Sequence, residues 1–249
     1  MRQAEKVDLG SDDWTMEIRP YASAFHFPIK ELWEYRDLLF LFVRRDFKTM
    51  YKQTILGPAW ILLSPLLTTG MFSLIFGRIA GISTDGTPTF LFYMAGNILW
   101  NYFSSCLSAA SSTFIGNAGL FGKVYFPRIV VPASSAVSKL ITFGAQFLLF
   151  LILLFCSLGS GQVRITWLCL MTPVLLVMLA LLAIGTGMIL ASLTAKYRDL
   201  QVLVGFGVQL WMYASPIVYP LSQIPGKWRI LLSLNPVAYI VECFRYGWG

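Results

Sequence analysis

Five long stretches of the chain contain no aspartate, glutamate or histidine, and this feature limits the possible folds more than any other. A helix needs about 20 apolar residues to cross the hydrocarbon core of a bilayer. The only basic residue inside the stretches is Lys139, close enough to one end for its side chain to reach the headgroups. The pattern predicts an all-α polytopic membrane protein, with spans at about 58–76, 88–110, 136–158, 167–195 and 200–220 in a transmembrane domain of residues 58–249.

Composition supports the same class and excludes several functions. Charged residues make up 12% of the 249 residues, about half of the ~25% typical of soluble domains. The single histidine and four scattered cysteines form no metal-ligand pattern, so we expect no metal, cofactor or catalytic residue in this chain. Spans without acidic or histidine side chains argue against ion-coupled carriers. They also argue against an intramembrane lipid-modifying enzyme, which remains the most distant alternative.

The basic residues predict how the chain is oriented in the membrane. Of the 19 Lys and Arg residues, 14 fall in residues 1–57 or in the loops after the second and fourth spans. Cytoplasmic loops carry an excess of Lys and Arg. We therefore expect the N-terminus and these loops in the cytoplasm, and residues 221–249 on the other side.

Two segments before the first span differ from the rest of the chain. Residues 1–29 form a polar tail to which we assign no role. In residues 30–57, apolar and basic residues alternate at helical spacing, which is typical of a helix lying in the headgroup plane. This interface helix is either a cuff that also contacts a partner or a plain membrane anchor. The basic residues of its polar face include Arg44, Arg45, Lys48 and Lys52.

The predicted cytoplasmic segment 116–134 is too polar and too interrupted to span a membrane. Exposed apolar residues on a short basic loop favour a docking surface for a soluble partner. A loop buried among headgroups explains them equally well. The apolar residues are Leu120, Phe121, Val124, Tyr125 and Phe126, which surround Lys123.

Five segments, in order, resemble the permease subunits of type-2 ABC exporters. The closest resemblance is to the Wzm permeases, which move lipid-linked O-antigen. The segments are Arg45–Trp60, Asn117–Arg128, Tyr197–Leu200, Ser215–Pro220 and Leu234–Val237.

This resemblance implies a six-span permease of the bacterial inner membrane that forms a homodimer. It also implies two copies of a separate, Wzt-like ATPase subunit, which binds ATP and magnesium. The interface helix would flank that subunit, and residues 221–236 would form a periplasmic gate. Members of the family continue into a sixth span and a basic tail, so we expect a sixth span beyond Gly249. The implied ATPase-coupling residues are Leu120, Phe121, Lys123, Val124, Tyr125, Phe126 and Arg128.

The cargo expected from the resemblance is a lipid-linked polysaccharide. The same fold could instead export teichoic acid, capsule or a lipophilic small molecule. Aromatic rings offer a sugar polymer broad and tolerant stacking contacts, as they do for single-stranded nucleic acids, although we expect no nucleic acid partner. Enrichment of Trp and Tyr at membrane interfaces and helix packing are the alternatives. The candidate channel residues are Trp60, Tyr93, Trp100, Tyr102, Phe103, Trp211, Tyr213 and Tyr219.

Overall fold

The computed structural model describes residues 29–51, 57–159, 163, 165–197, 199–226, 232 and 234–249. Most of these residues are helical, as the sequence predicts. The polar tail, apart from its last residue, and Lys52 of the interface helix lie outside the described residues. The elements are α1 (Ile29–Glu34), α2 (Arg36–Tyr51), α3 (Ala59–Phe72), η1 (Ser73–Ile79), α4 (Thr89–Ser111), α5 (Thr113–Gly116), α6 (Ala118–Phe121), α7 (Val130–Leu158), η2 (Trp167–Met171), α8 (Thr172–Lys196), α9 (Leu200–Tyr213), η3 (Leu221–Gln223) and α11 (Pro236–Trp248).

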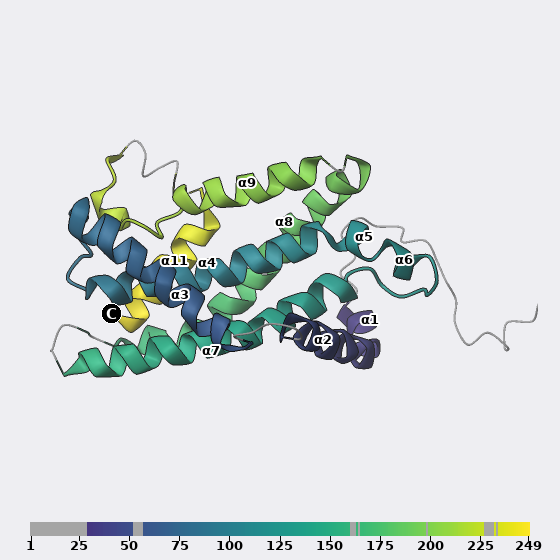
Figure 1. Ribbon diagram of the computed structural model, residues 1–249, viewed down its shortest axis with the longest axis horizontal. Coiled ribbons are helices and arrows are strands. Elements are labelled where there is room, and N and C mark those ends of the chain that lie inside the picture. Colours follow the sequence, from purple (N-terminus) through teal and green to yellow (C-terminus); the bar gives the residue numbers. More distant parts are fainter. Residues whose placement is uncertain are drawn as a thin grey trace, which may run out of the picture.

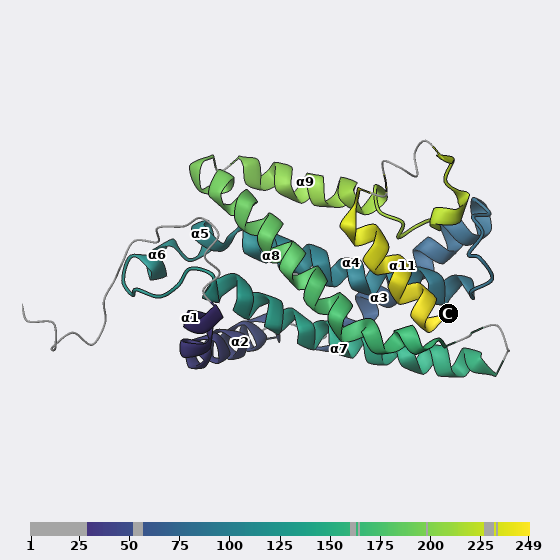
Figure 2. The same cartoon turned by 180° about the vertical axis from the view of Figure 1, so that it is seen from behind.

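Helix α4 is the centre of the bundle. It packs against α3, α7, α8, α9 and α11, and all of residues 91–100 are buried. In Figure 1, α9 and α7 run along opposite sides of α4, and Figure 2 shows α8 and α11 crossing behind it. The polar side chains of α4 therefore face protein rather than lipid.

Helices α4 and α8 approach closely at Gly187. A Cβ atom on this glycine would lie 2.5 Å from the Cβ of Ala110 and 3.0 Å from the carbonyl oxygen of Leu107. One turn further, the hydroxyl of Thr194 donates a 3.0 Å hydrogen bond to the carbonyl of Ser111. Small residues and interhelical hydrogen bonds are how helices pack within membranes.

The outer surfaces of α7 and α8 are apolar and exposed. Leu148 and Phe155 on α7, and Val177 and Leu181 on α8, each expose more than half of their surface. By length and composition, three described helical segments could cross a membrane: Ala59–Ile79, Val130–Leu158 and Trp167–Lys196. Helix α4, with 23 residues, has the length but is more polar.

A proline inside α3 is compensated by the neighbouring helix. Pro65 has no N–H to donate to the carbonyl of Ile61, its partner one turn earlier. The side-chain amide of Gln146 on α7 donates to this carbonyl at 3.3 Å. Another helix thus satisfies the freed backbone group, as membrane helices with proline require.

The structure corrects two predicted boundaries. The fifth stretch was expected to be helical over 200–220, but α9 ends at Tyr213 and is about 21 Å long. Pro216 explains the early end, because proline disfavours helical geometry at the preceding residue and lacks a backbone donor. The third span begins at Val130 rather than near 136, within the predicted coupling segment.

The expectation that residues 221–249 lie outside the bundle is wrong for α11. Its residues Val237, Val241 and Phe244 are buried, and the helix packs against α4, α8 and η2. Asn235 caps its first turn by accepting a 3.1 Å hydrogen bond from the N–H of Val237. Pro236 follows at the first helical position, where proline is tolerated.

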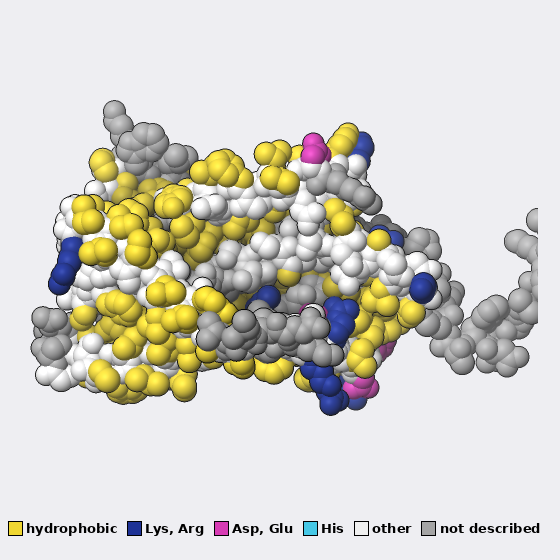
Figure 3. Space-filling model, viewed as in Figure 1, with side chains coloured by type: hydrophobic (Ala, Val, Ile, Leu, Met, Phe, Trp, Pro, Cys, Tyr) yellow, Lys and Arg dark blue, Asp and Glu magenta, His cyan; other side chains and the backbone are white. Residues whose placement is uncertain are grey.

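Charge is distributed unevenly along the bundle. Most of the Lys and Arg side chains visible in Figure 3 lie at the end formed by α2, α5 and α6. Hydrophobic side chains cover much of the remaining surface. Between α9 and α7, the same view shows a hollowed region with mostly polar side chains and backbone.

Candidate functional site

The segment between α4 and α7 folds onto the interface helix. Phe126 packs against Phe42 of α2 with ring centroids 5.9 Å apart, and Phe121 packs against Phe126 at 5.4 Å. Val130 and Val131, at the start of α7, complete a small hydrophobic cluster with these rings. The cluster joins two segments that the sequence suggested as separate surfaces.

This packing divides the predicted coupling residues into two groups. Phe126 is only 5% exposed, and Leu120 and Phe121 are partly buried against the cluster. Val124 and Tyr125 are each 54% exposed. Lys123 and Arg128 are exposed beside them. The tip formed by residues 123–125 is therefore free to contact a partner, whereas Phe121 and Phe126 support the loop from beneath.

Helix α2 presents three surfaces. Arg44, Arg45 and Lys48 are exposed, and the guanidinium of Arg45 lies 2.8 Å from the carboxylate of Asp46. Phe42 is buried against the bundle, while Phe40 is 64% exposed. The helix thus contacts α7 and still has apolar side chains available to lipid or to a partner.

Four of the aromatic channel candidates are buried within the bundle. Tyr93, Trp100, Tyr102 and Phe103 all lie on α4, and none exposes more than 5% of its surface. Phe103 forms edge-to-face contact with Trp211 of α9, with centroids 5.2 Å apart. These contacts are those of the packing alternative, and the channel role of the four residues stays a prediction.

The other aromatic candidates are more accessible. Trp60 at the start of α3 and Tyr213 at the end of α9 are about half exposed. Tyr219 is partly buried, and its hydroxyl donates a 3.0 Å hydrogen bond to the carbonyl of Tyr213. The structure therefore does not gather the eight candidate residues into one channel wall.

Arg245 of α11 holds the turn that follows α9. Its guanidinium donates hydrogen bonds of 2.6 and 2.7 Å to the carbonyls of Pro216 and Ile217, and lies 3.7 Å from the ring centroid of Phe92. Gly96 makes room for it, since a Cβ there would lie 2.5 Å from Nη2 of Arg245. A buried cation paired to two carbonyls and an aromatic face fixes this turn against α4.

Asn235 ties the same turn to α9 and α11. Its side-chain amide donates to the hydroxyl of Ser215 at 2.8 Å, and its oxygen accepts from the indole N–H of Trp211 at 3.2 Å. Two segments of the family resemblance, Ser215–Pro220 and Leu234–Val237, thus meet in space. Together with Arg245, they form a polar network at the end of the bundle opposite α2.

Sequence reasoning missed Arg245 and Glu242 as structural residues. Their charged groups lie 3.7 Å apart, and the N–H of Leu221 donates to the Glu242 carboxylate at 3.4 Å. The available signal was the presence of two ionisable residues in the otherwise apolar segment 236–248. Such residues in a membrane helix are seldom without a partner.

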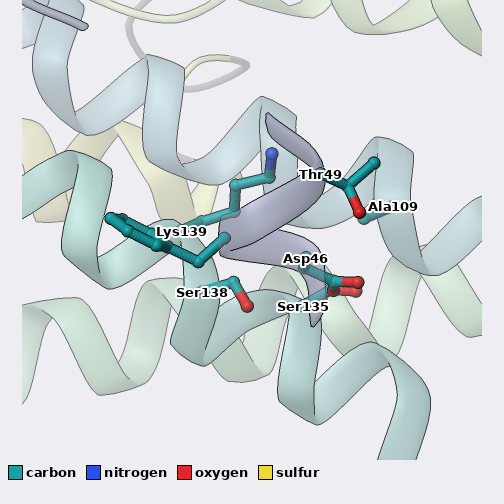
Figure 4. Close-up of a pocket in the computed structure, with 7 residues that line it drawn as sticks. Asp46, Thr49, Ala109, Ser135, Ser138 and Lys139 are labelled. Carbon is teal, nitrogen blue, oxygen red and sulfur yellow. The ribbon is translucent and has the colours of Figure 1, made fainter. Parts of the chain in front are cut away.

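Three cavities meet at Lys139 of α7. The largest, of 570 Å³, lies between α4 and α9 and is lined by Ser104, Ser105, Ser108 and Gln201 among others. A second, of 190 Å³, extends toward Ser64 and Gln146, and a third, of 360 Å³, lies against α2. Figure 4 shows the third, with Lys139 beside Asp46, Thr49, Ser135 and Ser138.

Comparison with known proteins places the fold in a family. Residues 37–248 match the model of the ABC-2 type transporter family. The chain is 31% identical to the O-antigen export system permease protein RfbA of Myxococcus xanthus, over 87% of this chain and 82% of that protein. It is 27% identical to RfbA of Klebsiella pneumoniae and 26% identical to the polysialic acid transport protein KpsM of Escherichia coli, in each case over 84% of this chain and 79% of the relative. The chain therefore belongs to the ABC-2 type transporter family.

Proposed function

We propose that this chain is the membrane subunit of an ATP-driven exporter of lipid-linked polysaccharide in the bacterial inner membrane. The observation that carries the proposal is its similarity, along most of its length, to permeases named for O-antigen and polysialic acid export. These two cargoes share a polysaccharide chain. The family, the apolar helices and the relatives all support a transport subunit rather than an enzyme.

In this proposal, a separate ATPase subunit supplies the energy and binds ATP with magnesium. Two observations support a contact at the tip formed by residues 123–125. Val124 and Tyr125 are exposed there, and the tip rests on a cluster that includes Phe42 of α2. A push on the tip would thus be transmitted to α2 and to the start of α7. Two copies of each subunit would form the complete exporter.

The same proposal places the N-terminus and this tip in the cytoplasm. The support is the excess of Lys and Arg at the end of the bundle that carries α2, α5 and α6 (Figure 3). The turn fixed by Arg245 and the segment 221–236 would then face the periplasm, where the polymer leaves.

Deletion of the chain in its host bacterium tests the proposal. We expect surface polysaccharide to disappear and lipid-linked polymer to accumulate inside the cell, with both effects reversed by the wild-type chain. Unchanged surface polysaccharide would contradict the proposed cargo. To separate other cargoes, ATP hydrolysis by the reconstituted complex is measured with lipid-linked polysaccharide, with teichoic acid and with a lipophilic dye. Stimulation by the polysaccharide alone is expected.

A further inference from the structure

We propose that Lys139 and the hydroxyl groups around it form a binding site for the phosphate group of a lipid. The inference deepens the proposed function, because it names the part of a lipid-linked substrate that this chain would recognise. It starts from a cation that the sequence offered only as a side chain reaching for the headgroups.

The first argument is the charge of Lys139. The residue is partly buried and borders three cavities. Within the described part of the chain, its ammonium makes no ion pair and no hydrogen bond. Asp46 is the one described acidic residue among those that line these cavities, and its carboxylate is paired with Arg45 at 2.8 Å. In Figure 4, the Lys139 amine is directed away from Asp46. A cation held partly out of water favours an anion as its partner.

The second argument is the supply of hydrogen-bond donors. The 570 Å³ groove carries the hydroxyls of Ser104, Ser105, Ser108 and Ser112 and the side-chain amide of Gln201. Lysine is a common phosphate ligand, and a phosphate offers several strong acceptor oxygens to surrounding donors. The carboxylate-poor, hydroxyl-rich wall fits a phosphate better than it fits a metal ion or a second cation.

A third observation comes from the opposite side of Lys139. The Oγ of Ser138 is buried, with the residue 8% exposed, and has no hydrogen-bond partner in the described structure. Ser138 lines the 360 Å³ cavity together with Lys139. Buried hydroxyls are normally paired, so an unpaired one beside an unpaired ammonium indicates a missing polar ligand.

The surroundings favour a phosphate carried by a lipid. Lys139 lies about 14 Å along α7 from Val130, where the amphipathic helix α2 packs across α7. Val204 of α9 borders both the hydroxyl-lined groove and a 370 Å³ apolar groove walled by Leu107, Leu190, Leu203 and Val208. A headgroup phosphate at Lys139 would therefore have an apolar groove nearby for its hydrocarbon chain.

Binding of farnesyl diphosphate tests the site. The full-length chain in phosphatidylcholine nanodiscs is titrated with this short lipid diphosphate, and dissociation constants are measured by calorimetry. We expect Lys139→Gln to weaken binding about tenfold or more, as loss of a charge-assisted contact does, and Lys139→Arg to retain most of it. Lys196→Gln, an exposed lysine at the end of α8, makes the same change in charge outside the groove and should bind as the wild type does.

The other outcomes separate the sources of the phosphate. Competition by phosphatidylglycerol as strong as that by farnesyl diphosphate would assign the site to membrane phospholipid and retain the phosphate chemistry. Equal binding of inorganic diphosphate would overturn the role of the lipid chain. Equal binding of farnesol, no binding to the wild type, or unchanged binding by Lys139→Gln would overturn the site. Export and ATPase play no part in this measurement, so its failure leaves the proposed function standing.

Discussion

The guanidinium of Arg245 donates a 2.7 Å hydrogen bond to the carbonyl of Ile217, and this contact joins α11 to the turn after α9. The carbonyl of Pro216 accepts from the same side chain at 2.6 Å. Both carbonyls follow the end of a helix, and no helical N–H pairs with them. Arginine reaches both at once because its donors form a rigid planar fork.

Replacing Arg245 with methionine should destabilise the protein strongly. The change leaves two buried carbonyls without donors, at a cost of about 1–3 kcal/mol each. Arg245→Lys should fall between the wild type and methionine, since an ammonium lacks the planar fork. Unfolding in detergent, followed by circular dichroism, gives the midpoints. Arg78→Met, at the exposed end of η1, is the control, and equal midpoints for Arg245→Met and this control would refute the role of the contact.

Alanine at Gly187 should loosen the packing of α4 on α8. The new methyl group would have to occupy a position 2.5 Å from the Cβ of Ala110, so the helices must separate. Overpacking of this kind costs about 1–3 kcal/mol. Gly185→Ala, two residues earlier on the same helix, meets nothing within 4 Å. It should be neutral or stabilising by up to about 1 kcal/mol, and a thermal midpoint at or below that of Gly187→Ala would be inconsistent with this packing.

The bond from Gln146 to Ile61 should matter only while Pro65 is present. Gln146→Leu removes the donor to the freed carbonyl and should cost about 1–3 kcal/mol. In a Pro65→Ala background, the backbone N–H of residue 65 can pair with Ile61, so the same change should cost less. A double-mutant cycle measured by chemical unfolding gives the coupling energy. A coupling energy near zero would mean that Gln146 acts through other contacts.

Aspartate at Val124 and at Phe126 should have different effects. Val124 is exposed at the tip, so Val124→Asp should leave the thermal midpoint unchanged and reduce ATP hydrolysis and export by the assembled complex. Phe126 is buried against Phe42, so Phe126→Asp should lower the midpoint of the chain on its own. Normal export by Val124→Asp and Tyr125→Asp would argue against docking at the tip.

Much of the fold follows from local sequence pattern. The bounds of α4 and α8 agree with the predicted stretches to within one or two residues at the ends, apart from the η2 turn that precedes α8. The amphipathic pattern of residues 30–57 corresponds to α1 and α2. These features depend on residues a few positions apart, whose spacing is visible in one dimension.

The sites depended on contacts between distant residues, which only the tertiary structure decided. Arg245 and Ile217 are 28 positions apart, and nothing local shows that a helix near the end of the chain returns to a turn after α9. Phe126 and Val124 look alike in sequence, yet packing against α2 buries one and exposes the other. Lys139 became a candidate ligand because α4, α7 and α9 enclose it among hydroxyls. Hydrophobic periodicity determines which segments become helices, whereas the fit of side chains between helices determines which polar groups meet.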